Sequence, residues 1–386
     1  MNQNVARITN LVTQIDDTEC FLGSVCPPTF ETTIFKIPDF DTAEKMSAGE
    51  DVRYSYSRTD GNPTLATLGR LLAAMENGEA AKTFASGTTA IFTAMISCLK
   101  KGDHVVIDRN AYGRAIGFLR NEFARFGVDH TFVDASDIDQ VRAAIRPETT
   151  LFYLESPCSW LFNVHDFRAL TKLAKEHGIK TITDNTYSTP VFQNPIDMGV
   201  DIVVHSATKY LGGHSATIGG VIVSTEDFIR NIAQVEGNLS THEASKLLLN
   251  LRTLPLRMER HYENAKAVAA FLEQSDKVSH VFYPGSPNHP QYDLIQRQMY
   301  GASGLLSFTL DCDRSGSKRF FDALRHISIG GSWGSYETVI YSTDFQRDFV
   351  DNSEFTTLLP HHNRFSVGLE DIDLLLSELE SALRAV

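Results

Sequence analysis

A lysine flanked by two hydroxyl side chains follows a short apolar run in the middle of the chain. Residues 201–205 are mostly β-branched, which predicts a buried parallel strand, and Ser206, Thr208 and Lys209 come directly after it. Ligands of open α/β sheets bind beyond the carboxyl ends of the strands. A lysine at such a place can be a Schiff-base nucleophile with phosphate-binding neighbours, whereas an isolated lysine in a polar turn would be a surface residue.

Three further features fall at expected strand ends and favour the first of these interpretations. The stretch Ser86-Gly87-Thr88 separates a strand from a helix, and a helix N-terminus presents free N–H groups to an anion. Asp184 ends another strand, and Tyr112 follows a third. A carboxylate can keep a pyridine nitrogen protonated, an aromatic ring can stack on it, and a lysine can form an imine. These are the parts that pyridoxal phosphate requires of a protein.

The elements that position these residues alternate along the chain. Strands separated by helices from residue 56 to residue 243 predict an α/β domain with a mostly parallel sheet that is covered on both faces. Residues 1–55 carry little helix or strand signal and are expected to form an N-terminal arm. Residues 244–386 are expected to form a smaller α+β domain that ends in an amphipathic helix.

Two helices of the α/β domain are predicted from local signals. One covers residues 115–126, and the other covers residues 137–145 with Ser136 as its N-cap, because a serine hydroxyl can accept from the first free N–H groups.

Composition excludes several classes of function. The 386 residues carry a formal net charge of −13, which disfavours nucleic-acid binding. No apolar run is long enough to span a bilayer, no signal peptide is visible, and the five cysteines lack metal-binding spacing. We therefore expect a protein with free thiols in the cytoplasm, without a membrane or nucleic-acid partner. Four histidines lack a matched set of further ligands, so no metal site is expected: His205, His214, His361 and His362.

Four segments of the chain together resemble a known family. They are Ser206-Ala-Thr-Lys-Tyr-Leu-Gly-Gly-His-Ser215, Asp184-Asn-Thr186, Tyr56-Ser-Arg58 with Asn62-Pro-Thr64, and Arg364-Phe-Ser-Val-Gly-Leu-Glu370. Each is weak alone, but the set is similar to the Cys/Met-metabolism (trans-sulfuration) pyridoxal-phosphate enzymes from about residue 27 to the C-terminus. The resemblance implies the aspartate-aminotransferase-like fold (fold type I), with a seven-stranded sheet in the larger domain, and pyridoxal phosphate as cofactor.

The resemblance also implies a role for each matching residue. Lys209 would form the Schiff base and move protons, Asp184 would pair with the pyridinium nitrogen, and Tyr112 would stack on the ring and take part in acid–base steps. Arg364 would bind the substrate α-carboxylate as a bidentate fork. The phosphate would be held by Gly87, Thr88, Ser206 and Thr208, with Tyr56 and Arg58 from a neighbouring subunit.

These roles have consequences and alternatives. A phosphate site shared between subunits implies a homo-oligomer, and we expect a tetramer built from dimers that share active sites. Asp184 could instead be a turn or helix-cap residue, Tyr112 an ordinary half-buried tyrosine, and Arg364 half of a surface ion pair.

Two stretches indicate which member of the family the chain resembles. Glu155-Ser-Pro-Cys-Ser-Trp160 places Ser159 where γ-lyases and γ-synthases have a cofactor-contacting asparagine. Ser332-Trp-Gly-Ser-Tyr-Glu337 resembles a segment of bacterial cystathionine β-lyases, so Ser332 would help bind the carboxylate and Trp333 would wall the pocket. Arg114 departs from both patterns and could meet an acidic substrate group or point to solvent.

The sequence therefore predicts a carbon–sulfur lyase that releases pyruvate, ammonia and a thiol by β-elimination from cystathionine or a related S-substituted cysteine. Two alternatives remain open. One is γ-chemistry, by a γ-lyase or by a γ-synthase that acts on an activated homoserine. The other is a pyridoxal-phosphate-binding protein without catalysis.

Overall fold

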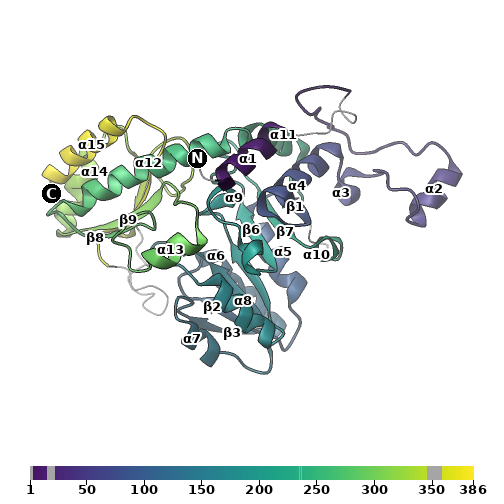
Figure 1. Cartoon of the computed structure of the whole chain (residues 1–386), viewed down its shortest axis with the longest axis horizontal. Coiled ribbons are helices and arrows are strands. Elements are labelled where there is room, and N and C mark those ends of the chain that lie inside the picture. Colours follow the sequence, from purple (N-terminus) through teal and green to yellow (C-terminus); the bar gives the residue numbers. More distant parts are fainter. Residues whose placement is uncertain (1–2, 15–21, 234, 236, 346–358) are drawn as a thin grey trace.

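The chain folds around two sheets that lie side by side and are joined by a long helix (Figure 1). The computed structural model describes residues 3–14, 22–233, 235, 237–345 and 359–386. In Figure 1 the smaller sheet, with the C-terminus, lies on the left, and the segment around α2 (Phe40–Ser47) projects on the right, away from both sheets.

The larger sheet has seven strands in the order β1-β7-β6-β5-β4-β2-β3. The four ladders from β6 to β3 are parallel, and the two that β7 makes, with β6 and β1, are antiparallel. The prediction of a mostly parallel seven-stranded sheet is confirmed. The strands are β1 (Ala80–Phe84), β2 (His104–Asp108), β3 (Asp129–Val133), β4 (Thr149–Glu155), β5 (Lys180–Asp184), β6 (Ile202–Ser206) and β7 (Gly220–Ser224).

Both faces of this sheet are buried, as its continuous apolar strands require. Val203 on β6 belongs to one core cluster and its neighbour Val204 to another, because successive side chains of a strand point to opposite faces. The first cluster includes residues of α4 (Pro63–Glu76), α8 (Phe167–Glu176) and α11 (Thr241–Leu251), and the second includes residues of α5 (Gly87–Cys98).

The five-stranded sheet, in the order β10-β11-β12-β9-β8, is antiparallel except between β10 and β11. A third cluster joins it to two C-terminal helices. The elements are β8 (Val278–Phe282), β9 (Leu305–Leu310), β10 (Ser328–Ile329), β11 (Val339–Ser342), β12 (His362–Ser366), α13 (Tyr292–Gln298), α14 (Arg314–Ala323) and α15 (Ile372–Arg384).

Helix α12 (Leu254–Glu273) belongs to both halves of the molecule. Leu254 and Met258 pack in the first cluster, and Ala265 and Val268 pack in the third. The domain boundary expected at residue 243 stays a prediction, because α11 and the start of α12 still pack with the larger sheet. None of the described helices is long and apolar enough to cross a membrane.

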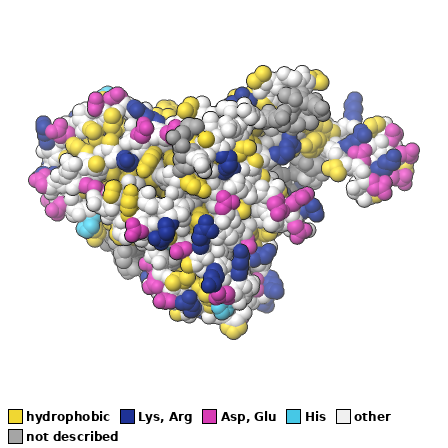
Figure 2. Space-filling model, viewed as in Figure 1, with side chains coloured by type: hydrophobic (Ala, Val, Ile, Leu, Met, Phe, Trp, Pro, Cys, Tyr) yellow, Lys and Arg dark blue, Asp and Glu magenta, His cyan; other side chains and the backbone are white. Residues whose placement is uncertain are grey.

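The N-terminal segment is more structured than its sequence suggested. Helix α1 (Gln3–Thr13) buries Val5, Ile8 and Val12 in the first cluster, and these three residues follow a helical spacing. The short helix α3 (Ser57–Asp60) follows α2. Acidic and basic side chains are interspersed on the face shown in Figure 2, including over the projecting end of the arm.

Two local predictions are wrong. Asp137, not Ser136, caps α7 (Ile138–Ala143): its carboxylate accepts from the N–H groups of Asp139 and Gln140. Residues 115–126 do not form one α-helix but α6 (Gly113–Gly117), a π-helical turn η1 (Phe118–Glu122) and a 3₁₀ turn η2 (Phe123–Phe126). The remaining short elements are α9 (Thr189–Phe192), η3 (Pro195–Met198), α10 (Glu226–Arg230) and η4 (Thr343–Phe345).

Candidate active site

A cavity of about 280 Å³ lies beyond the carboxyl ends of β4, β5 and β6. The end of each of these strands contributes a side chain to its wall, Glu155, Asp184 and Ser206, and β12 of the other sheet contributes Arg364. Parallel strands expose their carboxyl ends at one edge, which is why residues far apart in the sequence meet there.

Lys209 is the lysine of this cavity. Its Nζ donates a hydrogen bond to Ser332 Oγ at 2.9 Å and lies 5.2 Å from the centroid of the Trp333 ring. Burial, with the nearby Arg364 charge, lowers its pKa from 10.5 to about 8. The amine is therefore much closer to a nucleophilic, neutral state at physiological pH than an exposed lysine is.

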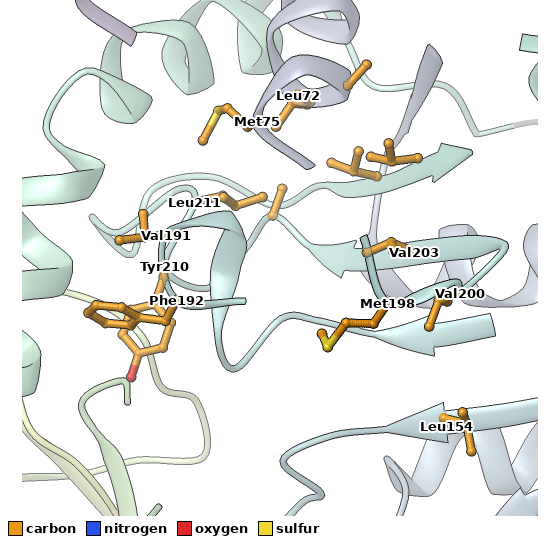
Figure 3. Close-up of a cluster of buried hydrophobic side chains, with 14 of the residues drawn as sticks. Leu72, Met75, Leu154, Val191, Phe192, Met198, Val200, Val203, Tyr210 and Leu211 are labelled. Carbon is orange, nitrogen blue, oxygen red and sulfur yellow. The ribbon is translucent and has the colours of Figure 1, made fainter. Parts of the chain in front are cut away.

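The backbone around Lys209 is fixed on two sides. Tyr210 and Leu211 are fully buried in the first core cluster, and Figure 3 shows both side chains there. On the cavity side, Gly334 has φ +82°, and a Cβ there would lie 3.0 Å from Tyr210 N. Only glycine allows that close approach, which brings Ser332 and Trp333 to the lysine.

Side chains of helix α12 form hydrogen bonds with the backbone at two edges of the cavity, next to Lys209 and just past Arg364. Arg257 Nη1 donates to the carbonyl of Tyr210 at 2.8 Å, next to Lys209 in the chain. His261 Nδ1 lies 2.8 Å from the carbonyl of Val367, and Asn264 Nδ2 donates to that of Gly368 at 3.0 Å, just past Arg364.

Asp184 is a buried carboxylate whose orientation is set by its neighbour. Its Oδ1 accepts from the N–H of Thr186 at 2.9 Å and also from the Thr186 hydroxyl. These bonds leave Oδ2 for a donor in the cavity. Burial raises the pKa of Asp184, while the hydrogen bonds from Thr186 oppose that shift. A cationic ring nitrogen in the cavity would compensate the charge.

Glu155 is a second buried carboxylate in the wall, and its sequence context alone did not predict a role for it. Its Oε2 accepts from the N–H of Tyr112 at 2.5 Å, and its Oε1 accepts from Ser159 Oγ at 2.6 Å. Burial, together with the charge of Asp184, raises its pKa from 4.5 to about 8. Its position at a strand end next to the strand of Asp184 was the signal that could have identified it.

The N-terminus of α5 offers an anion site. Ser86 caps the helix by accepting from Thr89 N, and the first intrahelical bond runs from Ala90 N to Ser86 O. The N–H groups of Gly87 and Thr88 therefore have no acceptor within the helix. A Cβ on Gly87 would lie 2.7 Å from that of Ser206, so the cradle is built around a glycine.

Arg364 stands on the opposite wall, where β12 pairs with β9 and β11. Its guanidinium carbon lies 4.7 Å from the centroid of the Trp160 ring. Burial lowers its pKa to about 10, so the group stays cationic at neutral pH. Such a cation suits the bidentate binding of a carboxylate.

The cavity thus brings together most of the predicted site residues. Those that line it directly are Gly87, Thr88, Tyr112, Ser159, Asp184, Ser206, Thr208, Lys209, Trp333 and Arg364, and Ser332 reaches it through Lys209. Lysine, buried carboxylate, aromatic ring and anion cradle match the imine, pyridinium, ring and phosphate of pyridoxal phosphate.

Three predicted residues are not in the lining of this cavity. Tyr56 and Arg58 lie at α3, with the guanidinium carbon of Arg58 5.4 Å from the centroid of the Tyr56 ring. Their contribution to a neighbouring subunit stays a prediction. Arg114 is exposed on α6 and outside this lining, although its charge acts on the Tyr112 phenol, and a contact with the substrate stays a prediction.

Comparison with known proteins gives a consistent result. The chain is 37% identical over 380 residues to the L-methionine gamma-lyase of Porphyromonas gingivalis, covering 94% of this chain and 93% of that protein. It is 36% identical to the cystathionine gamma-lyase of Bacillus subtilis, covering 94% and 95% of the two chains. It is 38% identical to the cystathionine gamma-synthase of Mycobacterium bovis, covering 86% of each.

A solved structure confirms the fold. The crystal structure of metB from Corynebacterium glutamicum superposes with a TM-score of 0.88 at 30% identity, covering 99% of this chain and 97% of that one. The expected fold type and the expected cofactor are thereby confirmed. Residues 9–384 match the family described as Cys/Met metabolism PLP-dependent enzymes, and the chain belongs to that family of pyridoxal-phosphate enzymes.

Proposed function

We propose that the chain is a carbon–sulfur lyase that performs β-elimination on an S-substituted cysteine. The observation that carries this proposal is the surroundings of the Lys209 amine: bound to Ser332 and close to Trp333, it has a lowered pKa and shares its cavity with the buried Arg364. These groups can receive an amino acid by its carboxylate and move the proton on its Cα.

In the proposed reaction, different residues bind the cofactor, bind the substrate and transfer the proton. Pyridoxal phosphate, when bound, supplies the electron sink that stabilises negative charge at Cα. Asp184 keeps the ring nitrogen protonated, and the N-terminus of α5 binds the phosphate. Arg364 holds the α-carboxylate, and the Lys209 amine takes the Cα proton. The Cβ–S bond then breaks, and the electron pair leaves with sulfur.

Tyr112 can complete the elimination. Burial raises the pKa of its phenol, so the group keeps its proton at neutral pH and can donate it to the departing thiolate. Overall, one water is consumed, and the substrate is converted to a thiol, pyruvate and ammonia.

The preference for β-elimination is supported by two residues in the cavity wall. By the resemblance of its segment, Ser159 would stand where γ-lyases and γ-synthases have an asparagine, and its hydroxyl donates to Glu155 Oε1. Trp333 belongs to the segment that resembles bacterial cystathionine β-lyases, and it lies against the amine of Lys209.

γ-Elimination is the second candidate, and the comparisons favour it. The relatives described above are named as γ-lyases and a γ-synthase, at 36–38% identity. γ-Chemistry requires a second proton to leave, from Cβ, and the same Lys209 amine is available for it.

Identification of the keto acid product distinguishes β-elimination from γ-elimination. The purified protein, loaded with pyridoxal phosphate, is incubated with L-cystathionine, S-methyl-L-cysteine and L-methionine. Pyruvate from cystathionine or S-methylcysteine supports β-elimination. 2-Oxobutyrate from cystathionine or methionine, without pyruvate, would replace the proposal by γ-elimination.

A further inference from the structure

Both tryptophans of the chain line the active-site cavity. Trp333 lies over the amine of Lys209, with 5.2 Å from Nζ to the ring centroid, and Trp160 lies over the guanidinium of Arg364, with 4.7 Å from Cζ to the centroid. Each indole therefore covers one of the two cations of the cavity. The proposed reaction uses Trp333 but gives no role to Trp160.

The backbone of Trp160 is in an uncommon conformation that the surrounding structure maintains. Its φ is +69°, in the left-handed region, which costs about 1–2 kcal/mol for a residue with a side chain. Ser307 Oγ donates to its carbonyl at 2.5 Å, and Cys158 N donates to the carbonyl of Asn163 at 2.9 Å across the same turn. Such strain at a cavity wall is typical of a functional position.

A proline could not replace Trp160 in this conformation. Proline fixes φ near −65°, so the turn that presents the indole excludes it. The position of the Trp160 indole thus depends on the left-handed backbone conformation of the turn after β4.

Within one subunit, the lining of the cavity offers no third cation for a second carboxylate on the substrate. The charged side chains in its lining are Glu155, Asp184, Lys209 and Arg364. The two cations are needed for the cofactor and the α-carboxylate. The charge of Arg114 acts on the Tyr112 phenol, but Arg114 itself is exposed and outside the lining. A further carboxylate would lose its hydration against aromatic rings and close to the carboxyl groups of Glu155 and Asp184, without a cation to compensate it, which is costly.

We propose that Trp160 is a specificity-determining residue that selects an uncharged sulfur substituent. Its indole holds the Arg364 fork in place and receives the thioether or alkyl group, since sulfur–aromatic contacts contribute about 0.3–1.5 kcal/mol. The substrate class is then an S-alkyl amino acid, and a side chain that ends in a second carboxylate, such as that of cystathionine, is a poor substrate. This deepens the proposed lyase function and rests on it.

Binding can be measured without catalysis. 3-(Methylthio)propanoate has the carboxylate and the thioether but no amine, so it cannot react with the cofactor; 3,3′-thiodipropanoate adds a second carboxylate. In the Trp333→Phe holoenzyme, Trp160 is the sole tryptophan. We expect saturable quenching of its emission by the monocarboxylate and at least tenfold weaker binding of the dicarboxylate. Equal affinities, or no change in Trp160 emission, would overturn the proposal.

Variants of Trp160 test the same point in turnover. Glycine accepts the positive φ and opens the wall, whereas phenylalanine keeps an aromatic face. We expect Trp160→Gly to lower kcat/KM for S-methyl-L-cysteine about tenfold, mainly through KM, and to shift preference towards cystathionine by at least as much. Trp160→Phe should retain most of the wild-type preference. An unchanged preference ratio in Trp160→Gly would contradict the assignment.

The two arms separate the possible failures. If no thioether amino acid yields a keto acid but the monocarboxylate still binds selectively at Trp160, the lyase function fails and the selectivity stands. If keto acids form and the fluorescence experiment shows no selectivity, the role of Trp160 fails alone.

Discussion

Glu155 and Asp184 are direct partners across β4 and β5, and both carboxyl groups are buried at the end of the sheet. Burial and the charge of its neighbour raise the pKa of Glu155 to about 8, and burial also raises the pKa of Asp184. Two like charges in this position would repel each other, so the pair favours a state with fewer than two negative charges until a cation enters the cavity.

This pair makes the stability of the cofactor-free protein depend on pH. Because the pKa of Glu155 is raised from 4.5 to about 8 in the folded state, its contribution is complete below pH 4.5 and is lost as the pH rises through 8. Glu155→Gln removes that titration. We expect thermal melting temperatures of the wild-type protein to fall between pH 5 and pH 8 more steeply than those of the variant. Parallel curves would show that Glu155 does not titrate in this range.

Replacement of Lys209 tests the assignment of the cofactor. In Lys209→Ala no amine remains to form the imine, so we expect loss of its visible absorbance and a fall in turnover of at least about a thousandfold. Lys318→Ala is the matched control, because Lys318 is exposed and pairs with Asp322 on α14. The assignment would be wrong if Lys209→Ala kept both the absorbance and the turnover.

Arg364→Lys keeps the charge but removes the planar fork. A lysine cannot make two parallel hydrogen bonds to a carboxylate, so we expect kcat/KM to fall about 10- to 100-fold, chiefly by an increase in KM. Arg384→Lys, at an exposed arginine that pairs with Glu380, should leave the kinetics unchanged. Steady-state kinetics with the preferred thioether substrate test this role. An unaltered KM would show that Arg364 does not bind the substrate carboxylate.

Mixed oligomers test whether Arg58 serves a neighbouring subunit. Arg58→Ala and Lys209→Ala should each be inactive or nearly so. If Arg58 binds the phosphate of the other subunit, a dimer with one subunit of each kind contains one site with both residues intact. Co-refolding the two variants should then restore about a quarter of the wild-type activity, by random pairing. No restoration in mixtures that form hybrid dimers would place Arg58 in its own subunit's site or outside any site.

The parts that could be predicted from the sequence are those set by local pattern. The buried strands and the residues at their ends, such as Asp184 and Lys209, follow from apolar runs and from the rule that ligands lie beyond carboxyl ends. The pairing of Glu155 with Asp184 depends on the register between strands, and the contact of Trp160 with Arg364 joins two different sheets. Such relations are created by tertiary packing, which no single segment encodes.

Local misjudgements have equally local causes. Asp137 and Ser136 are both good caps, and the choice between them depends on which backbone N–H groups the turn presents. Helix α1 was overlooked because three apolar residues in a polar segment are a weak signal until the larger sheet provides a surface for them.

Helix α12 sets the distance between two edges of the active-site cavity. The anchors Arg257 and Asn264 are seven residues apart, which is about 10 Å along a helix. One inserted residue between them would rotate one anchor about 100° relative to the other, so that only one edge of the cavity could stay attached. The separation between the backbone next to Lys209 and the backbone just past Arg364 is therefore set by the number of α12 residues between these two anchors. This separation limits the length of the substrate that the Lys209 amine and the Arg364 guanidinium can bind at once.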